Sequence, residues 1–395
     1  MTRLKLCFAR AIVMTTGAVA LALLTPSQHS MAAGQWFTLV PRYSLTEVEL
    51  SSPARASVLT DSEVVAGRAC YPGIGCHAFY YKDGNVRDLG TLGGHDSWAH
   101  GANDRGQVVG DSETGQSSIG GFLYQDGVLQ DFGALVGMLA TAHGINKQGQ
   151  VTGGATTSDF YTHAYVYNDG VVHDLGTLGG SWSEGLAIND RGNVTGYSAT
   201  SDQNVRAFIY RDGVMEDIGT LGCCNSLGSD INERGDVTGQ SAGIDSEGNF
   251  FADHAFLYSN GVMRDLGTLG GYFSIGSAVN DSRQVTGNSI TEHGEYHAFL
   301  YVNGAMHDLN DLIESDDPLR LHVTLYEGAD INDHGVIVAN GRNTQTGQDM
   351  VYVLRPVNNG GGGSIDWQTI CLLALFVAWS TYSGFMARRH GQAYC

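Results

Sequence analysis

The stretch His173–Gly185, HDLGTLGGSWSEG, contains a heptapeptide that the chain uses three times. DLGTLGG stands at Asp88–Gly94, Asp174–Gly180 and Asp265–Gly271. Internal repetition with a period of roughly 20 to 50 residues is typical of solenoids, propellers and other repeat arrays. The heptapeptide therefore marks a structural unit, and the residues around it show how large that unit is.

Two further anchors recur in phase with the heptapeptide. The aromatic residue of HAF-like segments recurs at spacings of 43, 43, 43, 48 and 43 residues, and a seventh copy stands near Val351. An asparagine in segments such as AINDRG follows the same period. The aromatic anchors are Phe79, Phe122, Tyr165, Phe208, Phe256 and Phe299, and the asparagines are Asn103, Asn146, Asn189, Asn232, Asn280 and Asn332.

Each unit divides into four strand-like pieces, such as GLAIN, NVTGYS, AFIY and VMEDIGTL. The first two pieces are joined by Asn-Asp-x-Gly, which is typical of a type I turn that ends in a left-handed glycine. The last two are joined by Asp-Gly or Asn-Gly, the strongest short signal for a hairpin. One turn departs from the pattern, because Arg283 stands where the glycine is expected. We expect that turn to be strained or rebuilt.

Four short antiparallel strands every 43 residues predict an all-β fold, a seven-bladed β-propeller with four-stranded blades. A β-solenoid is the alternative. Seven copies of the first three strands are present, but the last copy has no fourth strand after it. The segment Arg42–Leu50 precedes the first blade and has the spacing of a fourth strand. We therefore expect it to close the last blade beside Val351–Leu354, which leaves no open sheet edge. DLGTLGG then forms the outer strand and the crossover to the next blade.

Both ends of the chain have the character of processing signals. Residues 1–33 combine a basic start, an apolar run and small residues, which predicts a secretory signal that signal peptidase cuts between Ala33 and Gly34. A short N-terminal membrane anchor is the alternative. The repeat body then covers 34–357.

A glycine-rich linker, a membrane segment and a basic tail are predicted after the body. The linker covers 358–364, the apolar segment at 365–387 is long enough to cross a bilayer as a helix, and the tail covers 388–395. Basic residues after the span place the C-terminus in the cytoplasm. A buried helix is the alternative for the apolar segment. The residues that define this pattern are Gly360, Gly361, Gly362 and Gly363 in the linker, and Arg388 and Arg389 in the tail.

The pattern HAFLY…DG…DLGTLGG…S…IND.G.V.G resembles the HAF family of extracellular repeat proteins over roughly Arg42–Leu354. The resemblance implies export and a repeat fold, and it implies no particular activity. The tail resembles a GlyGly-CTERM sorting signal, although HGQAYC continues beyond the arginines. That second resemblance implies processing by a rhomboid-like membrane protease before sorting to the cell surface or release.

Charge and motifs exclude several classes of function. The segment 34–365 contains 16 basic and 40 acidic residues, a net charge of −24, which disfavours nucleic acid as a partner. The GQSAG segment at Gly239–Gly243 aligns with an ordinary second strand, so it is not expected to form a nucleophile elbow. The recurring histidines are His77, His163, His254 and His297, and equivalent positions of a ring lie one or more blades apart. We therefore assign no catalytic residue, no cofactor and no metal site.

The cysteines of the repeat body form two pairs. Cys70 and Cys76 bracket YPGIG, and their spacing in an exported protein predicts a disulfide. Cys223 and Cys224 stand where the other repeats have glycines. For this second pair, a strained vicinal disulfide and two free thiols both remain open.

Variation between the repeats indicates where a ligand would bind. The turns between the first and second strands, and between the third and fourth, are uniform, whereas the loops at the opposite end of the blades vary in length and sequence. A rigid scaffold with variable loops is typical of a binding protein, so we expect a glycan or protein ligand there. An exported polysaccharide lyase or hydrolase is the alternative. The candidate ligand residues are His95, Asp96, Trp182, Asn225, Tyr272 and Phe273.

Overall fold

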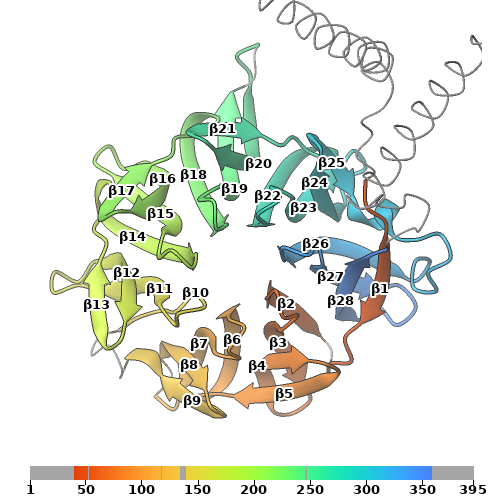
Figure 1. Cartoon of the computed structure of the whole chain (residues 1–395), viewed down its shortest axis with the longest axis horizontal. Helices are drawn as coiled ribbons and strands as arrows, with labels where there is room; N and C mark the ends of the chain where they lie inside the picture. Colours follow the sequence, from red (N-terminus) through yellow and green to blue (C-terminus); the bar gives the residue numbers. More distant parts are fainter. Residues whose placement is uncertain (1–39, 52, 117, 134–138, 245–246, 358–395) are drawn as a thin grey trace, which may run out of the picture. The chain divides into compact units, whose positions relative to one another are not determined.

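The computed structural model describes residues 40–51, 53–116, 118–133, 139–244 and 247–357. These residues form seven four-stranded antiparallel sheets arranged as the blades of a propeller (Figure 1). The predicted seven-bladed β-propeller is therefore confirmed, and the alternative of a solenoid is wrong. The signal at 1–33 and the segments predicted beyond residue 357 lie outside the described residues. Between residues 40 and 357, no described helix has the length and hydropathy that a bilayer crossing requires.

Blades 1 to 6 each run outward from an inner strand, and blade 7 combines the two ends of the described chain. The inner strands are β2 (Ala54–Leu59), β6 (Gly93–Ala102), β10 (Gly144–Ile145), β14 (Gly179–Ile188), β18 (Gly222–Ile231), β22 (Gly270–Val279) and β26 (Val323–Ile331). The second strands are β3 (Val65–Tyr71), β7 (Val108–Thr114), β11 (Val151–Thr156), β15 (Val194–Thr200), β19 (Val237–Ile244), β23 (Val285–Thr291) and β27 (Ile337–Asn343).

In blades 1 to 6 the outer half is a tight hairpin with a left-handed Asp or Asn before its glycine, whereas the outer half of blade 7 pairs β28 with β1. The third strands are β4 (Gly75–Lys82), β8 (Ile119–Gln125), β12 (Thr162–Asn168), β16 (Val205–Arg211), β20 (Phe250–Ser259), β24 (Tyr296–Val302) and β28 (Asp349–Pro356). The outer strands are β5 (Asn85–Gly90), β9 (Val128–Asp131), β13 (Val171–Asp174), β17 (Val214–Asp217), β21 (Val262–Asp265), β25 (Ala305–Asp308) and β1 (Tyr43–Glu47), and the 3-10 helix η1 (Leu309–Leu312) lies between blades 6 and 7.

The heptapeptide covers the end of an outer strand, the crossover and the start of the next inner strand. The outer strand β13 ends at Asp174, whose carboxylate accepts a hydrogen bond from the backbone of Gly176 at 2.8 Å. Gly179 and Gly180 belong to β14, so the inner strands begin earlier than the sequence pattern indicated. A Cβ atom on Gly180 would lie 2.6 Å from Ala199, which explains why the repeat has glycine here.

The recurring histidines hold the outer hairpins together. Nδ1 of His163, at the start of β12, lies 2.9 Å from the carboxylate of Asp174, at the end of β13. The same pair, eleven residues apart, recurs in three other blades. The HAF and DLG segments are therefore two halves of one contact, and this contact accounts for their joint repetition.

The aromatic anchors pack between neighbouring blades. Phe122 of blade 2 is fully buried in a cluster with Ala78 and Leu89 of blade 1. Phe79 of blade 1 packs in the same way against Val338 and Val351 of blade 7. The core is therefore divided into clusters between adjacent blades, and each blade depends on its neighbours for burial of its apolar face.

The asparagine anchors form a hydrogen-bonded ring around the central channel. Each side-chain oxygen accepts bonds from its own turn, as Asn189 does from the backbone of Arg191 and Asn193. Each side-chain nitrogen donates to the backbone oxygen of the equivalent residue in the next blade, at 2.9 to 3.2 Å. The backbone oxygen of Thr60 in blade 1 accepts a bond from Asn332. The threonine side chain has no amide group, so it cannot donate the corresponding bond to blade 2. The ring therefore lacks one of its seven links.

Arg283 adopts the left-handed conformation that its position requires. Its φ is 60°, and its backbone donates to Asn280 as the glycines of the other turns do. The turn is therefore retained, so the expectation of a rebuilt turn is wrong and the expectation of strain is correct. Nε of Arg283 lies 2.8 Å from the buried carboxylate of Asp236, and this ion pair offsets the strain.

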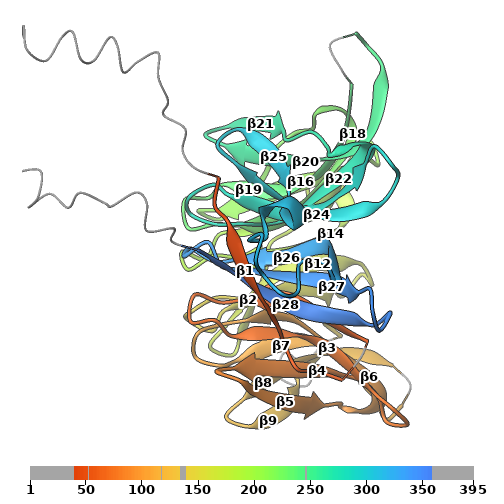
Figure 2. The same ribbon diagram turned by 90° about the vertical axis from the view of Figure 1, so that its right-hand side faces the viewer.

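Pairing of β1 with β28 closes the ring, as the sequence predicted. The strands are antiparallel, with Tyr43 opposite Pro356, Leu45 opposite Leu354 and Glu47 opposite Tyr352. Figures 1 and 2 show β1, from the start of the described chain, beside β28, from its end. Side chains of β1 alternate between the core and solvent, so this strand is an integral part of blade 7.

Replacing Leu45 with aspartate should open the ring. Leu45 is 8% exposed within the core of blade 7, and an unpaired carboxylate there should cost on the order of 3 kcal/mol or more of unfolding free energy. Urea unfolding of the purified chain measures this loss. Thr46→Asp on the exposed side of the same strand is the control and should change little. Equal losses in both variants would show that β1 does not hold the ring through its buried face.

The missing link of the asparagine ring gives a second prediction. Thr60→Asn should supply the seventh donor and raise the free energy of unfolding by about 0.5 to 1.5 kcal/mol, the net contribution of one hydrogen bond. Asn189→Ala should lower it by more, because it leaves two backbone donors and one acceptor without their partner. Thermal and urea unfolding measure both. A destabilised Thr60→Asn protein would contradict the role assigned to the ring.

Candidate functional site

The seven inner strands surround a central channel (Figure 1). Two cavities of about 220 and 160 Å³ lie along it. The first lies at the asparagine turns, and the second is lined by residues deeper along the inner strands. The residues of the inner strands therefore decide what the channel can hold.

Carboxylates and one lysine surround the channel at the asparagine turns. The residue after each asparagine anchor is acidic, except in blade 3, where it is Lys147. Nζ of Lys147 lies 3.4 Å from Asp61, 3.5 Å from Asp190 and 3.9 Å from Asp104. Burial lowers the pKa of Lys147, but these three carboxylates outweigh it, so its pKa is raised. The acidic residues also accept backbone bonds from neighbouring turns, so this end of the channel is primarily structural.

Two half-buried carboxylates lie deeper in the channel. Asp230 of β18 accepts a bond from the backbone of Val279 at 2.8 Å, and Asp330 of β26 accepts one from Leu59 at 2.7 Å. Each thus joins its inner strand to the next blade. Burial raises the pKa of Asp230 to about 6. Burial and the charge of Asp230 raise the pKa of Asp330 to about 8.

A cluster of histidines and carboxylates lies where blades 2 and 3 meet. His100 of β6 and His143, just before β10, have ring centroids 5.1 Å apart. Nε2 of His100 lies 3.0 Å from Asp111 of β7, and Nε2 of His143 lies 2.9 Å from Glu184 of β14. Burial raises the pKa of Glu184, but bonds from His143, Tyr197 and Thr141 outweigh it and leave the pKa lowered.

A small cavity adjoins this cluster. It has a volume of about 200 Å³, and its lining includes Arg68, Trp98 and Asp111. The Arg68 guanidinium lies 4.7 Å from the centre of the Trp98 ring, which in turn stacks on His100. Nε of Arg68 and Oδ1 of Asp111 are buried and have no partner among the described residues.

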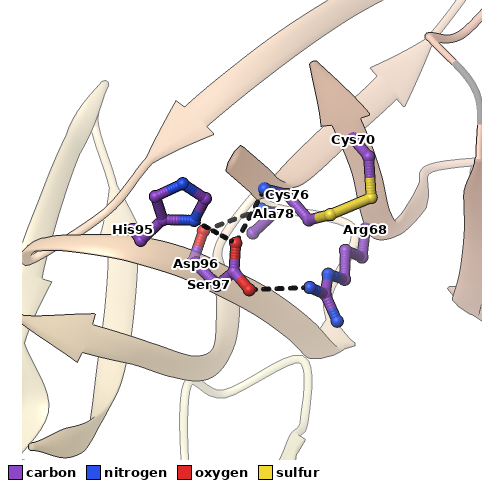
Figure 3. Close-up of a disulfide and its surroundings, with 7 residues drawn as sticks. All are labelled: Arg68, Cys70, Cys76, Ala78, His95, Asp96 and Ser97. Atoms are coloured by element: carbon purple, nitrogen blue, oxygen red, sulfur yellow. Dashed lines mark hydrogen bonds and ion pairs between the residues drawn. A yellow bond between two sulfur atoms is a disulfide. The ribbon is translucent and has the colours of Figure 1, made fainter. Parts of the chain in front are cut away.

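The disulfide of blade 1 positions part of this cavity (Figure 3). Cys70 of β3 and Cys76 of β4 are joined in the structure. The backbone of Cys76 donates to Asp96 at 2.8 Å, and Arg68 donates to the same carboxylate at 2.9 Å. His95 contacts Asp96 at 3.0 Å. Asp96 therefore fastens blade 2 to the disulfide-bonded hairpin of blade 1, and His95 contacts this carboxylate from within blade 2.

The other cysteine pair is not joined in the structure. Cys223 and Cys224 carry free thiols with their sulfur atoms 2.7 Å apart. Only Cys223 replaces a glycine of the repeat, because Gly222 keeps the first position at a φ of 111°. The interpretation that both cysteines replace glycines is wrong.

A larger groove lies between blades 3 and 4, at the end of the blades opposite the asparagine turns. Its volume is about 780 Å³. The ring of Trp182 lies in its wall and is supported edge-on by Tyr197 at 5.6 Å. Tyr161, just before β12, is half exposed and also lines the groove. The lining also includes Thr177, Ser181, Thr200, Ser201 and Gln203, and none of the described lining residues carries a carboxylate.

The remaining predicted ligand residues lie at the same end of other blades. Asn225 of β18 accepts a bond from the backbone of Val205 at 3.0 Å, so its side chain joins blades 5 and 4. Phe273 of β22 contacts Tyr296 edge-on, and Tyr272 is 69% exposed. The structure therefore distributes the six residues over blades 2, 4, 5 and 6, and only Trp182 lines the large groove.

The sequence did not lead to His100, His143, Trp98 or Arg68. His100 and His143 both stand three residues before their asparagine anchor, so they occupy equivalent positions of consecutive blades. Histidines at equivalent positions of the third strand are too far apart to share a ligand. Residues at equivalent positions of the inner strand are closer together, because neighbouring blades converge there. Two histidines 43 residues apart at one inner-strand position were the available signal.

This chain is distantly similar to several solved structures. No protein-family model matches the sequence, and no curated protein is significantly similar to it. A puromycin-hydrolysing peptidase of Mycobacterium tuberculosis superposes with a TM-score of 0.46 and 12% identity over 78% of this chain and 55% of its own. This chain thus spans little more than half of that protein.

Two smaller solved structures are matched over most of their length. TolB from Acinetobacter baumannii has a TM-score of 0.39 and 11% identity over 74% of this chain and 81% of its own. A mutant of AofleA from Arthrobotrys oligospora has a TM-score of 0.29 and 13% identity over 81% of this chain and 88% of its own. No functional conclusion follows from likenesses at this level.

The raised pKa values of the two channel carboxylates, Asp230 and Asp330, predict a pH dependence of stability. Asp230 and Asp330 hold their protons in the folded protein up to about pH 6 and about pH 8, whereas the unfolded chain releases them near pH 4. The folded state therefore binds more protons between these values, and its stability should fall as the pH rises through this window. Asp330→Asn cannot ionise, so its stability relative to the unmodified protein should improve from pH 5 to pH 9. Urea unfolding across that range measures the difference, and a constant difference would contradict the raised pKa of Asp330.

Proposed function

We propose that this protein is an exported, surface-anchored repeat protein of the HAF type that binds neutral glycans between blades 3 and 4. The groove there carries the proposal. A cavity of about 780 Å³ is in the range of small-molecule sites, which are typically about 300 to 1,000 Å³. Export, anchoring and HAF membership rest on the sequence pattern.

The chemistry of the groove suits a sugar. Trp182 and Tyr161 offer flat apolar surfaces, and the hydroxyl and amide groups around them can both donate and accept hydrogen bonds. Trp182 is held by Tyr197, whose hydroxyl donates to Glu184 at 3.0 Å, so the aromatic surface is fixed before a ligand arrives. Such a fixed surface reduces the entropy cost of binding.

The same groove does not favour a hydrolase. Most glycoside hydrolases need two carboxyl groups, one on each side of the bond that is broken. The described residues that line this groove include no aspartate or glutamate. A binding module is therefore the better interpretation of this site than the alternative of a polysaccharide-active enzyme.

A glycan array probed with the purified chain tests the proposal. Binding should be seen for one group of neutral glycans and should fall at least tenfold in Trp182→Ala and Tyr161→Ala. Trp98→Ala, which removes a tryptophan outside the groove, is the matched control and should bind normally. Tyr272→Ala reports whether a long ligand extends across blade 6.

Several outcomes would count against the proposal. If no glycan binds, or if Trp98→Ala weakens binding as much as Trp182→Ala, the groove is not the glycan site. Release of reducing sugar from a bound polysaccharide would show that the enzyme alternative is correct.

Gly192→Val at a turn with a φ of 79° should lower stability and leave the affinity of the folded protein unchanged.

A further inference from the structure

The junction of blades 2 and 3 contains an arrangement that neither the fold nor glycan binding explains. One ligand atom from each of His100, Asp111 and His143 lies within 4.8 Å of the other two. The three residues come from β6, β7 and the segment before β10, so the fold brings them together from two blades. Each of the three side chains is half buried, and each lines one of the cavities described above.

We propose that His100, Asp111 and His143 bind a divalent transition-metal ion, with zinc the best match. Two imidazoles and one carboxylate are a common zinc ligand set, with bonds of about 2.0 to 2.2 Å. Ligand atoms of a tetrahedral site are then roughly 3.4 Å apart. Nε2 of His100 is 3.0 Å from Oδ2 of Asp111, and all three ligand atoms lie within 4.8 Å of one another, so small shifts of the side chains would bring them to this spacing.

An unpartnered atom supports the site independently. Oδ1 of Asp111 is buried and has no hydrogen-bond partner among the described residues, although a buried carboxylate oxygen without a partner is costly. The other oxygen, Oδ2, contacts only His100 in the described structure. A cation bound by the two imidazoles would also give the Asp111 carboxylate the partner that it lacks.

Glu184 completes the site as a positioning residue. Oε1 of Glu184 lies 2.9 Å from Nε2 of His143, and the same carboxylate accepts bonds from Thr141 and Tyr197. Histidine ligands of metals are usually held by a carboxylate in this way. These three contacts fix the orientation of the His143 ring across the boundary between blades 3 and 4.

The site is accessible and retains open coordination positions. His100 and His143 line the 160 Å³ cavity of the channel, and Asp111 lines the neighbouring 200 Å³ cavity. Three protein ligands leave at least one position of a tetrahedral ion for water or a ligand atom. The ion can therefore enter from the channel, and it can exchange with solvent.

Titration of the chelator-treated full chain, without a histidine tag, tests the site. Calorimetry with Zn²⁺ should show one ion per chain. His100→Ala, His143→Ala and Asp111→Asn should each weaken binding at least tenfold. Glu184→Gln should weaken it by about 10-fold, because its effect is through the orientation of His143. Co²⁺ should give the visible absorption of a four- or five-coordinate ion, and this absorption should be lost in the same variants.

The control is His163→Ala, which removes a histidine that pairs with Asp174 but belongs to no group of three metal-ligating side chains among the described residues. It should leave the Zn²⁺ affinity unchanged. Asp111→Asn keeps the shape of the side chain, so it reports on the site even if a histidine variant does not fold. Failure of Zn²⁺ to bind, or equal affinities in the cluster variants and in His163→Ala, would overturn the proposal. Neither result bears on the glycan groove, which shares none of the three ligands.

Discussion

The contacts between blade 7 and blade 1 are the constraint on which the rest of the structure depends. The amide of Asn340 bonds to both the backbone nitrogen and the backbone oxygen of Ala56, at 2.8 and 3.0 Å. Asp330 and Asn332 add bonds to Leu59 and Thr60 across the same boundary. With β1 paired to β28, these bonds convert a row of sheets into a ring. The channel and its cavities exist only because the ring is closed.

The period of the sequence predicted the blades because equivalent residues meet the same surroundings in every blade. His163 and Asp174 illustrate this, since the same contact between a third strand and an outer strand recurs in four of the blades. Strand limits were harder to predict, because Gly179 and Gly180 were assigned to a crossover and belong to β14. A glycine pair signals conformational freedom, and only the packing against Ala199 shows that it is strand. The conformation of the turn at Arg283 was hard to predict for a related reason, because the partner of its side chain, Asp236, lies 47 residues away in the sequence.

The candidate site could be predicted only in part. Trp182 was found because it stands at a variable position just after the repeated DLGTLGG motif, and it does line the large groove. The sequence did not predict the cluster of His100, Asp111 and His143. Whether equivalent residues of adjacent blades come into contact depends on how far their strand lies from the axis of the propeller. On the inner strand, equivalent residues of adjacent blades approach within contact distance, as the two imidazoles do. On the third strand, the histidines instead pair with an aspartate of their own blade.

This radial dependence explains how a uniform repeat can carry local chemistry. The position three residues before the asparagine anchor is histidine in blades 2 and 3, whereas the other blades have Ser57, Leu186, Ser229, Ser277 and Ala329 there. A histidine in a single blade would face only small or apolar neighbours. Histidines in two consecutive blades lie side by side, and Asp111 and Glu184 then meet them from the adjoining strands. Variation between neighbouring repeats, more than variation in any one of them, therefore determines the chemistry of the channel wall.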